Sequence, residues 1–316
     1  MFAARGIALS FSVFVMVYCV LSLAVCLTWR KVWLHSQGLP IRRMADFLFA
    51  LRMFPLVAAA LITVAFTVPS FLLLEPRAID EPMGGIPLSL AICGAGLGIF
   101  GAANAAIAMR KASRTISTWT RDAQPVDSSA PVPVLRISPP IPAMTAAGIV
   151  RPRVLLSGAA ESMLTANELQ AALNHEISHL RRRDNLKKLL LRVVAFPGMS
   201  TLEASWLEAT EMAADDAAVS NAAEALDLAA ALIKLSRLGP VEPPVGLSAA
   251  LVHSPAAVMN ARVERLIAWN QERLLSPPKY SPWYALGTVL ATVGVFVVTY
   301  GQLLVHVHTA TEWLVR

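Results

Sequence analysis

Four long apolar runs constrain the fold of this chain more than any other feature of its sequence. They cover residues 6–29, 53–74, 86–109 and 283–305. A hydrocarbon layer of about 30 Å requires roughly 20 apolar residues in a helix, and each run reaches that length. Hydrophobic residues make up 56% of the 316-residue chain and charged residues only 15%, which is more apolar than is usual for a soluble globule. The sequence therefore predicts a mainly α-helical membrane protein with four transmembrane helices.

The charges between these runs predict how the helices are oriented. Basic residues predominate after the first and third runs, and acidic residues predominate after the second. The basic residues are Arg30, Lys31, Arg42 and Arg43, then Arg110, Lys111, Arg114 and Arg121, and the acidic ones are Glu75, Asp80 and Glu81. Because lysine and arginine collect in cytoplasmic loops, we expect a multi-pass protein of the cell membrane with both termini outside. The net charge of +6 is explained by such loops beside anionic headgroups of the lipid bilayer, and it does not indicate a nucleic-acid partner.

The sequence predicts three parts along the chain. Residues 1–109 hold three transmembrane helices, residues 110–280 form a cytoplasmic domain, and residues 281–316 form the fourth transmembrane helix with a short tail. In the cytoplasmic part, two β-like runs at 133–138 and 151–157 precede mainly helical sequence, which indicates an α+β domain. The second run is either an edge strand on which an extended substrate pairs or an internal strand of a small sheet.

The strongest chemical signal is the sequence "NHEISHLRRRDN" at residues 174–185. His175 and His179 are four residues apart on a predicted helix, so they project from the same face and could share one tetrahedral metal ion. His-Glu-x-x-His on a helix is typical of zinc peptidases, in which the glutamate, here Glu176, acts on metal-bound water. The alternative is a basic surface helix whose two histidines are merely solvated.

A third ligand is needed for a strong zinc site, and the downstream sequence Glu-x-x-Ala-Asp contains a candidate. Glu211 is predicted to be this ligand, and Asp215, one turn later, is predicted to accept the free ring N–H of a ligating histidine. Glu203 and Glu208 are alternatives, but Glu208 has no aspartate four residues later. The predicted Zn²⁺ ligands are therefore His175, His179 and Glu211.

Four segments carry a resemblance to a known family. They are "AMTAAGIVRPRVLLS" (143–157), "LTANELQAALNHEISHLRRRDNL" (164–186), Glu-x-x-Ala-Asp (211–215) and "NARVERL" (260–266), preceded by three apolar runs and followed by a fourth. Together they resemble the membrane-bound zinc metallopeptidases of the BlaR/MecR antirepressor type. The resemblance implies a gluzincin-like domain between the third and fourth membrane helices. It also implies that Glu176 is the catalytic base beside a zinc ion bound by His175, His179 and Glu211.

The resemblance further implies an integral membrane zinc metalloendopeptidase that acts in signal transduction by regulated proteolysis. Its expected substrate is a cytoplasmic transcriptional repressor, such as a small winged-helix protein, or the chain itself. Two alternatives stay open, a membrane-protein quality-control zinc peptidase and a non-catalytic zinc-binding membrane scaffold. Glu176 disfavours the scaffold, because a non-catalytic site needs no base. Sensor members of the family continue into an extracellular penicillin-binding domain, which we expect this chain to lack, so a sensor partner protein is an expected source of the signal.

Overall fold

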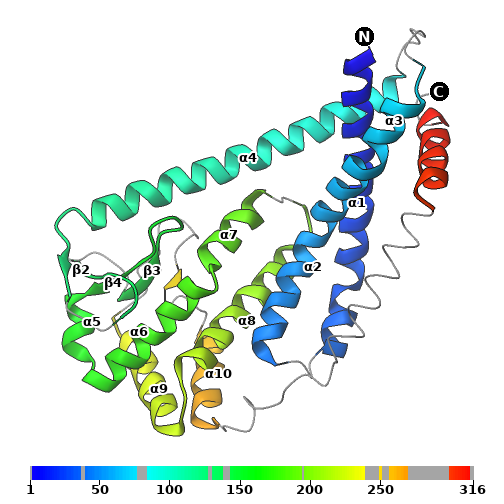
Figure 1. Ribbon diagram of the computed structural model, residues 1–316. Coiled ribbons are helices and arrows are strands. Elements are labelled where there is room, and N and C mark those ends of the chain that lie inside the picture. The colour runs from blue at the N-terminus through cyan, green and yellow to red at the C-terminus, as the bar shows by residue number, and fades with distance from the viewer. Residues whose placement is uncertain are drawn as a thin grey trace. The chain divides into compact units, whose positions relative to one another are not determined.

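The computed structural model describes residues 2–36, 40–76, 84–126, 130–137, 143–193, 196–238, 249–250, 256–269 and 299–313. The described chain is mainly helical and contains a small β-sheet (Figure 1). It divides into two compact units. The first consists of Met1–Arg30, Leu51–Phe100 and Ser276–Arg316, and the second consists of Lys31–Ala50 and Gly101–Leu275.

Within the described residues, three helical segments are long and apolar enough to cross a membrane. The first is α1 (Phe2–Ser36) and the third is α4 (Gly85–Trp119). The second is continuous and consists of α2 (Ile41–Ile62), a π-helical turn η1 (Thr63–Thr67) and α3 (Val68–Leu74). These segments contain the first three predicted runs. The fourth run lies mostly outside the described residues, although residues 299–313, which overlap its end, are helical. Four membrane spans and the sidedness of the protein therefore stay predictions.

Small residues and polar side chains hold the helices of the first unit together. A side chain at Gly94 of α4 would lie 2.9 Å from the carbonyl oxygen of Phe11 on α1, so the missing Cβ is what lets the two helices approach. Tyr300 donates a hydrogen bond of 2.6 Å to the carbonyl oxygen of Ala65 in η1. This bond connects the helix at 299–313 to the second membrane segment.

The β-sheet belongs to the second unit and has the strand order β1-β2-β4-β3-β5 among the described residues. The strands are β1 (Gln124–Pro125), β2 (Val134–Ile137), β3 (Met144–Ala147), β4 (Arg153–Ser157) and β5 (Ala249–Ala250). β2 and β4 are parallel, whereas the other pairs are antiparallel. The second β-like run of the sequence is therefore an internal strand, and the interpretation of residues 151–157 as an edge strand is wrong. Val154, Leu155 and Leu156 are fully buried, as expected for a strand with neighbours on both sides and covered faces.

Besides parts of α1, α2 and α4, the helices described in the second unit are α5 (Gly158–Met163), α6 (Ala166–Arg181), α7 (Asp184–Val193), α8 (Ser200–Ala218), α9 (Ala222–Ser236) and α10 (Ala256–Ile267). α6 begins with a capping box in which Glu168 accepts from the backbone N–H of Thr165 (2.8 Å) and Thr165 accepts from that of Glu168 (3.3 Å). The apolar side of α6, including Leu173 and Ile177, joins the core shared with the sheet and α9. The helix is thus held from several directions, which fixes the side chains on its remaining face.

Candidate metal centre

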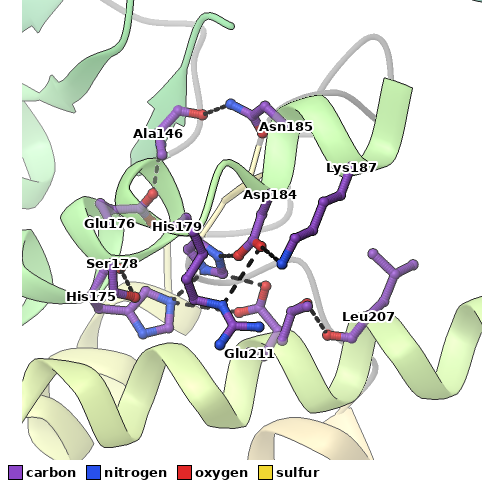
Figure 2. Close-up of polar contacts among 12 residues, drawn as sticks. Ala146, His175, Glu176, Ser178, His179, Asp184, Asn185, Lys187, Leu207 and Glu211 are labelled. Atoms are coloured by element: carbon purple, nitrogen blue, oxygen red, sulfur yellow. Dashed lines mark hydrogen bonds and ion pairs between the residues drawn. The ribbon is translucent and has the colours of Figure 1, made fainter. Parts of the chain in front are cut away.

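Three side chains from two helices meet at one point in the second unit. His175 and His179 project from α6 and Glu211 projects from α8, and one ligand atom from each lies within 4.8 Å of the others. The two histidine Nε2 atoms are 3.1 Å apart. Each of them lies 3.6 Å from an oxygen of Glu211. Figure 2 shows the two imidazoles and the Glu211 carboxylate facing a common centre.

These separations fit a tetrahedral metal ion. Two ligand atoms that are each about 2.0–2.1 Å from such an ion lie about 3.3 Å apart, because a tetrahedron fixes the angle between them. The observed separations of 3.1 and 3.6 Å lie close to this value on either side. The donor set of two imidazole nitrogens and one carboxylate also matches the chemistry that zinc prefers. The three residues could therefore hold one ion and leave a coordination position open.

Both histidines have a carboxylate on the opposite ring nitrogen. Nδ1 of His175 lies 2.9 Å from Oδ1 of Asp215, and Nδ1 of His179 lies 2.8 Å from Oδ2 of Asp184. A carboxylate that holds the proton on Nδ1 leaves the lone pair of Nε2 directed at the metal, and it also fixes the plane of the ring. His175 and His179 are 0% and 2% exposed, so they are not the solvated histidines of a surface helix.

The sequence predicts only that Asp184 caps or tethers the end of the helix that carries His175 and His179, and it predicts no contact with either histidine. The connection between α6 and α7 is short, and Arg183 within it adopts a left-handed backbone conformation with φ 56°. This conformation is uncommon for a residue with a side chain and costs of order 1 kcal/mol. It turns the chain back so that Asp184, the first residue of α7, is fully buried against His179. The strained turn therefore places a carboxylate that helical spacing alone does not predict.

Arg262 is a second residue whose place at the centre the sequence does not reveal. Its guanidinium is fully buried and grips Asp215 with two hydrogen bonds, from Nε to Oδ2 (2.8 Å) and from Nη2 to Oδ1 (2.7 Å). Its Nη1 lies 3.1 Å from Oε2 of Glu211. Arg262 comes from α10 and lies in the motif "NARVERL", which carries the resemblance but reads on its own as an amphipathic helix. One arginine thus compensates the two carboxylates that α8 contributes.

The charges of the centre favour the ionised forms of Glu211 and Asp215 and the protonated form of His175. Burial opposes ionisation of Glu211, but His179, His175 and Arg262 outweigh it and lower the pKa of Glu211 to about 2. Burial also opposes the charge of Asp215, yet Arg262 and His175 hold its pKa below the usual value. Burial would lower the pKa of His175, whereas the hydrogen bonds to Asp215 and Glu211 raise it to about 9. In the metal-free protein His175 therefore keeps its second proton at neutral pH, and an incoming metal ion must displace it.

Glu176 lies beside the three candidate ligands and is fully buried. Its Oε2 accepts a hydrogen bond of 2.5 Å from the backbone N–H of Ala146 on β3. Its Oε1 has no hydrogen-bond partner within the part of the chain that the structure describes. Burial raises the pKa of Glu176, the negative charge of Glu211 adds to this effect, and the two histidines oppose it. One carboxylate oxygen is thus anchored by the sheet and the other is buried and unsatisfied, as expected of a base that acts on a bound water.

A further cation lies near these carboxylates. Lys188 is one turn after Asp184 on α7, so both residues are on the same face of that helix. Burial lowers the pKa of Lys188, while the negative charges of Glu211, Asp184 and Glu176 oppose this shift. Lys188 is therefore, like Arg262, a basic residue of the centre that was not identified from the sequence.

The alternative third ligands lie elsewhere on α8. Glu208 is exposed and Glu203 is partly exposed, and neither belongs to the ligand cluster found among the described residues. Glu211 occupies the side of α8 that faces α6, whereas Glu208 lies just under one turn earlier and points outward. The structure therefore brings Glu211, and neither alternative, to the two histidines.

Comparison of the sequence with known families identifies the family of this chain. The sequence model of the BlaR1 peptidase M56 family matches residues 90–266, which is more than half of the chain. The chain belongs to this family. The matched segment contains every residue of the candidate metal centre, from Ala146 to Arg262, and the predicted BlaR/MecR-type resemblance is confirmed. No curated protein matches the chain. The protein is thus a member of a metallopeptidase family, with helices long and apolar enough to cross a membrane.

Proposed function

We propose that this protein is an integral membrane zinc metalloendopeptidase that acts in regulated proteolysis. The observation that carries the proposal is the ligand cluster of His175, His179 and Glu211 beside Glu176, whose buried Oε1 lacks a partner among the described residues. A scaffold that only bound zinc would gain nothing from a buried, unsatisfied carboxylate, which costs free energy. This cost is understandable where the carboxylate takes part in a reaction.

The residues of the centre have separate roles in the proposed reaction. His175, His179 and Glu211 hold the zinc ion, and Asp215 and Asp184 orient the two imidazoles. When bound, zinc supplies a Lewis acid that polarises the scissile carbonyl and lowers the pKa of a bound water towards about 7.

Glu176 carries out the proton transfers. Its Oε1 accepts the proton of the attacking water and then donates it to the nitrogen of the leaving amine. Throughout, the backbone N–H of Ala146 holds Oε2 and keeps the carboxylate in position. Arg262 stays paired with Asp215 and Glu211 and offsets the repulsion between their two carboxylates.

The proposed substrate is a cytoplasmic transcriptional repressor, such as a small winged-helix protein, or the chain itself. Membership of the BlaR1 peptidase family supports this choice. A membrane-protein quality-control peptidase is the second candidate, since it would use the same zinc chemistry on unfolded membrane chains. A sensor partner protein is proposed to supply the activating signal.

Zinc binding tests the assignment of the centre. We expect about one zinc ion per chain in protein purified in detergent, because the cluster offers ligands for a single ion. Glu211→Ala should lose most of this zinc, whereas Glu208→Ala, a matched loss of a carboxylate from the exposed side of the same helix, should keep it. Metal analysis by mass spectrometry measures both. Equal zinc content in the wild type and Glu211→Ala would rule out the proposed ligand set.

We also propose that the peptidase part of the chain is cytoplasmic and that both termini are outside. The alternating charges of the links between the apolar runs support this orientation. A fluorescent reporter that folds only in the cytoplasm should be active when fused after Ala130, and an exported phosphatase should be active when fused after Arg316. The reverse pattern would place the metal centre outside the cell and exclude an intracellular repressor as substrate.

A further inference from the structure

A cavity of about 310 Å³ lies between the second half of α4 and the turn that joins β3 to β4. Both walls belong to the second unit, and Figure 1 shows this part of α4 running along the strands. The volume is within the range of small-molecule binding sites. None of the residues that line the cavity belongs to the candidate metal centre.

The lining combines an apolar wall with two cations. Met109 and Ile116 of α4 supply apolar surface, and two arginines, Arg151 of the turn and Arg153 at the start of β4, supply positive charge. The residues that line the cavity, all in the described part of the chain, include no carboxylate, and neither arginine has an ion-pair partner there. By contrast, the nearby Arg136 on β2 is paired with Glu161. The cavity is therefore suited to an anion that also has an apolar portion.

The position of the cavity along α4 points to the membrane interface. The apolar run of α4 ends at Met109, and the cavity-lining Ala112 and Ser113 follow three and four residues later, about 5–6 Å further along the helix. The headgroup layer beyond the hydrocarbon core is roughly 5–7 Å thick on each side. The exposed residues Arg110, Lys111 and Arg114 add positive charge on the same turns, which attracts an anionic lipid surface.

The turn that forms the other wall has a backbone that is constrained at two positions. Gly148 has a φ of 89°, and a Cβ at this position would collide with the carbonyl oxygen of Arg151. Pro152 further restricts the backbone just before β4. Asn185 of α7 donates to the carbonyl oxygen of Ala146 (3.1 Å), which ties the base of the hairpin to the helix beside the metal centre. With the backbone constrained in this way, the ordering that a bound ligand requires falls mainly on the two arginine side chains.

We propose that this cavity binds the anionic headgroup of a membrane phospholipid. The lipid phosphate accepts charge-assisted hydrogen bonds from Arg151 and Arg153, and the apolar part of the lipid follows Met109 and Ile116 back towards the membrane. Val150, at the tip of the turn, is 79% exposed, and its side chain lies in the interfacial layer when the lipid is bound. None of the residues that line the cavity takes part in the proposed peptide-bond hydrolysis, although the hairpin includes β3, whose Ala146 holds Glu176.

Lipid retention on the full-length chain tests this proposal. The protein is purified in a mild detergent doped with phosphatidylglycerol or with phosphatidylcholine, and native mass spectrometry counts the lipids that stay bound. We expect phosphatidylglycerol to be retained in preference to phosphatidylcholine. The double variant Arg151→Gln/Arg153→Gln should weaken this binding by about tenfold or more, the effect of losing charge-assisted hydrogen bonds. Arg237→Gln, which removes an exposed arginine at the end of α9, is the matched control and should bind like the wild type.

A second variant tests whether lipid binding requires the space inside the cavity as well as the charge of the two arginines. Ala112→Trp fills the cavity and keeps both arginines, so it should also lose the lipid. Equal retention of the two lipids, or wild-type retention by either cavity variant, would overturn the proposal. Displacement of phosphatidylglycerol by equal concentrations of inorganic phosphate or glycerol phosphate would also overturn it, because the cavity would then recognise free phosphate and not a lipid.

Discussion

Glu176→Gln is expected to lower the rate of peptide-bond cleavage by about 10²–10⁴-fold, the usual contribution of a general base. The amide has the shape of the carboxylate, and its oxygen can still accept from the backbone N–H of Ala146. It cannot take a proton from water at the position of Oε1. Zinc content should not change, since His175, His179 and Glu211 are all retained. The measurement is the cleavage of a small winged-helix repressor, followed by gel electrophoresis and mass spectrometry of the products.

Controls separate this effect from a general loss of structure. Glu168→Gln removes a carboxylate from the same helix, and because glutamine also completes a capping box, the variant should cleave at the wild-type rate. Cleavage by Glu176→Gln at the wild-type rate would contradict the proposed mechanism.

An unfolded membrane protein, offered as a second substrate, separates the two candidate functions. We expect the repressor to be cut at a discrete position. Cleavage of the unfolded chain at many positions, with the repressor left intact, would favour the quality-control function. In both cases the wild-type enzyme and Glu176→Gln are compared at equal zinc content.

Arg262→Met is expected to lower the free energy of unfolding by about 3–5 kcal/mol, the cost of leaving a buried charge without its partner. Asp215 is fully buried and both of its oxygens accept from Arg262, so the methionine variant leaves this carboxylate with only the contact to His175 (Nδ1 to Oδ1, 2.9 Å) among the described residues. Thermal unfolding of the metal-free protein measures the loss. Arg265→Met is the matched control on the same helix, because Arg265 pairs with the partly exposed Asp216 (Nη2 to Oδ1, 2.6 Å). Its effect should be within about 1 kcal/mol.

A double variant distinguishes charge compensation from orientation of the histidine. Asp215→Asn/Arg262→Met removes both buried charges and should regain much of the lost stability. It should still bind zinc about 10–100-fold more weakly than the wild type, because His175 loses the carboxylate on Nδ1. If Arg262→Met unfolds at the same temperature as Arg265→Met, Arg262 does not have the compensating role that its contacts indicate.

The parts of the structure that depend on residues close together in the chain were predicted correctly from the sequence. The apolar runs at 6–29, 53–74 and 86–109 lie within long helices, because a run of apolar residues in lipid must satisfy its backbone hydrogen bonds internally. The spacing of His175 and His179 places them on one face, since the helical repeat alone decides this. The same repeat distinguished Glu211 from Glu208, because only Glu211 has an aspartate one turn later. Local periodicity was sufficient for each of these predictions.

Only the tertiary structure shows which residues from distant parts of the chain surround His175, His179 and Glu211. Residues 151–157 read equally well as an edge or an internal strand, and only pairing with both β2 and β3 makes them internal. β3 itself, the short stretch Met-Thr-Ala-Ala, has little strand character, yet its Ala146 holds Glu176 from 30 positions away. Asp184 reaches His179 through a left-handed turn, and Arg262 reaches Asp215 across 47 positions. In the sequence both are ordinary charged residues near helix ends or on an amphipathic helix. Whether such a charge is solvated or buried beside a metal ligand depends on what packs against it, which the residues next to it in the chain do not determine.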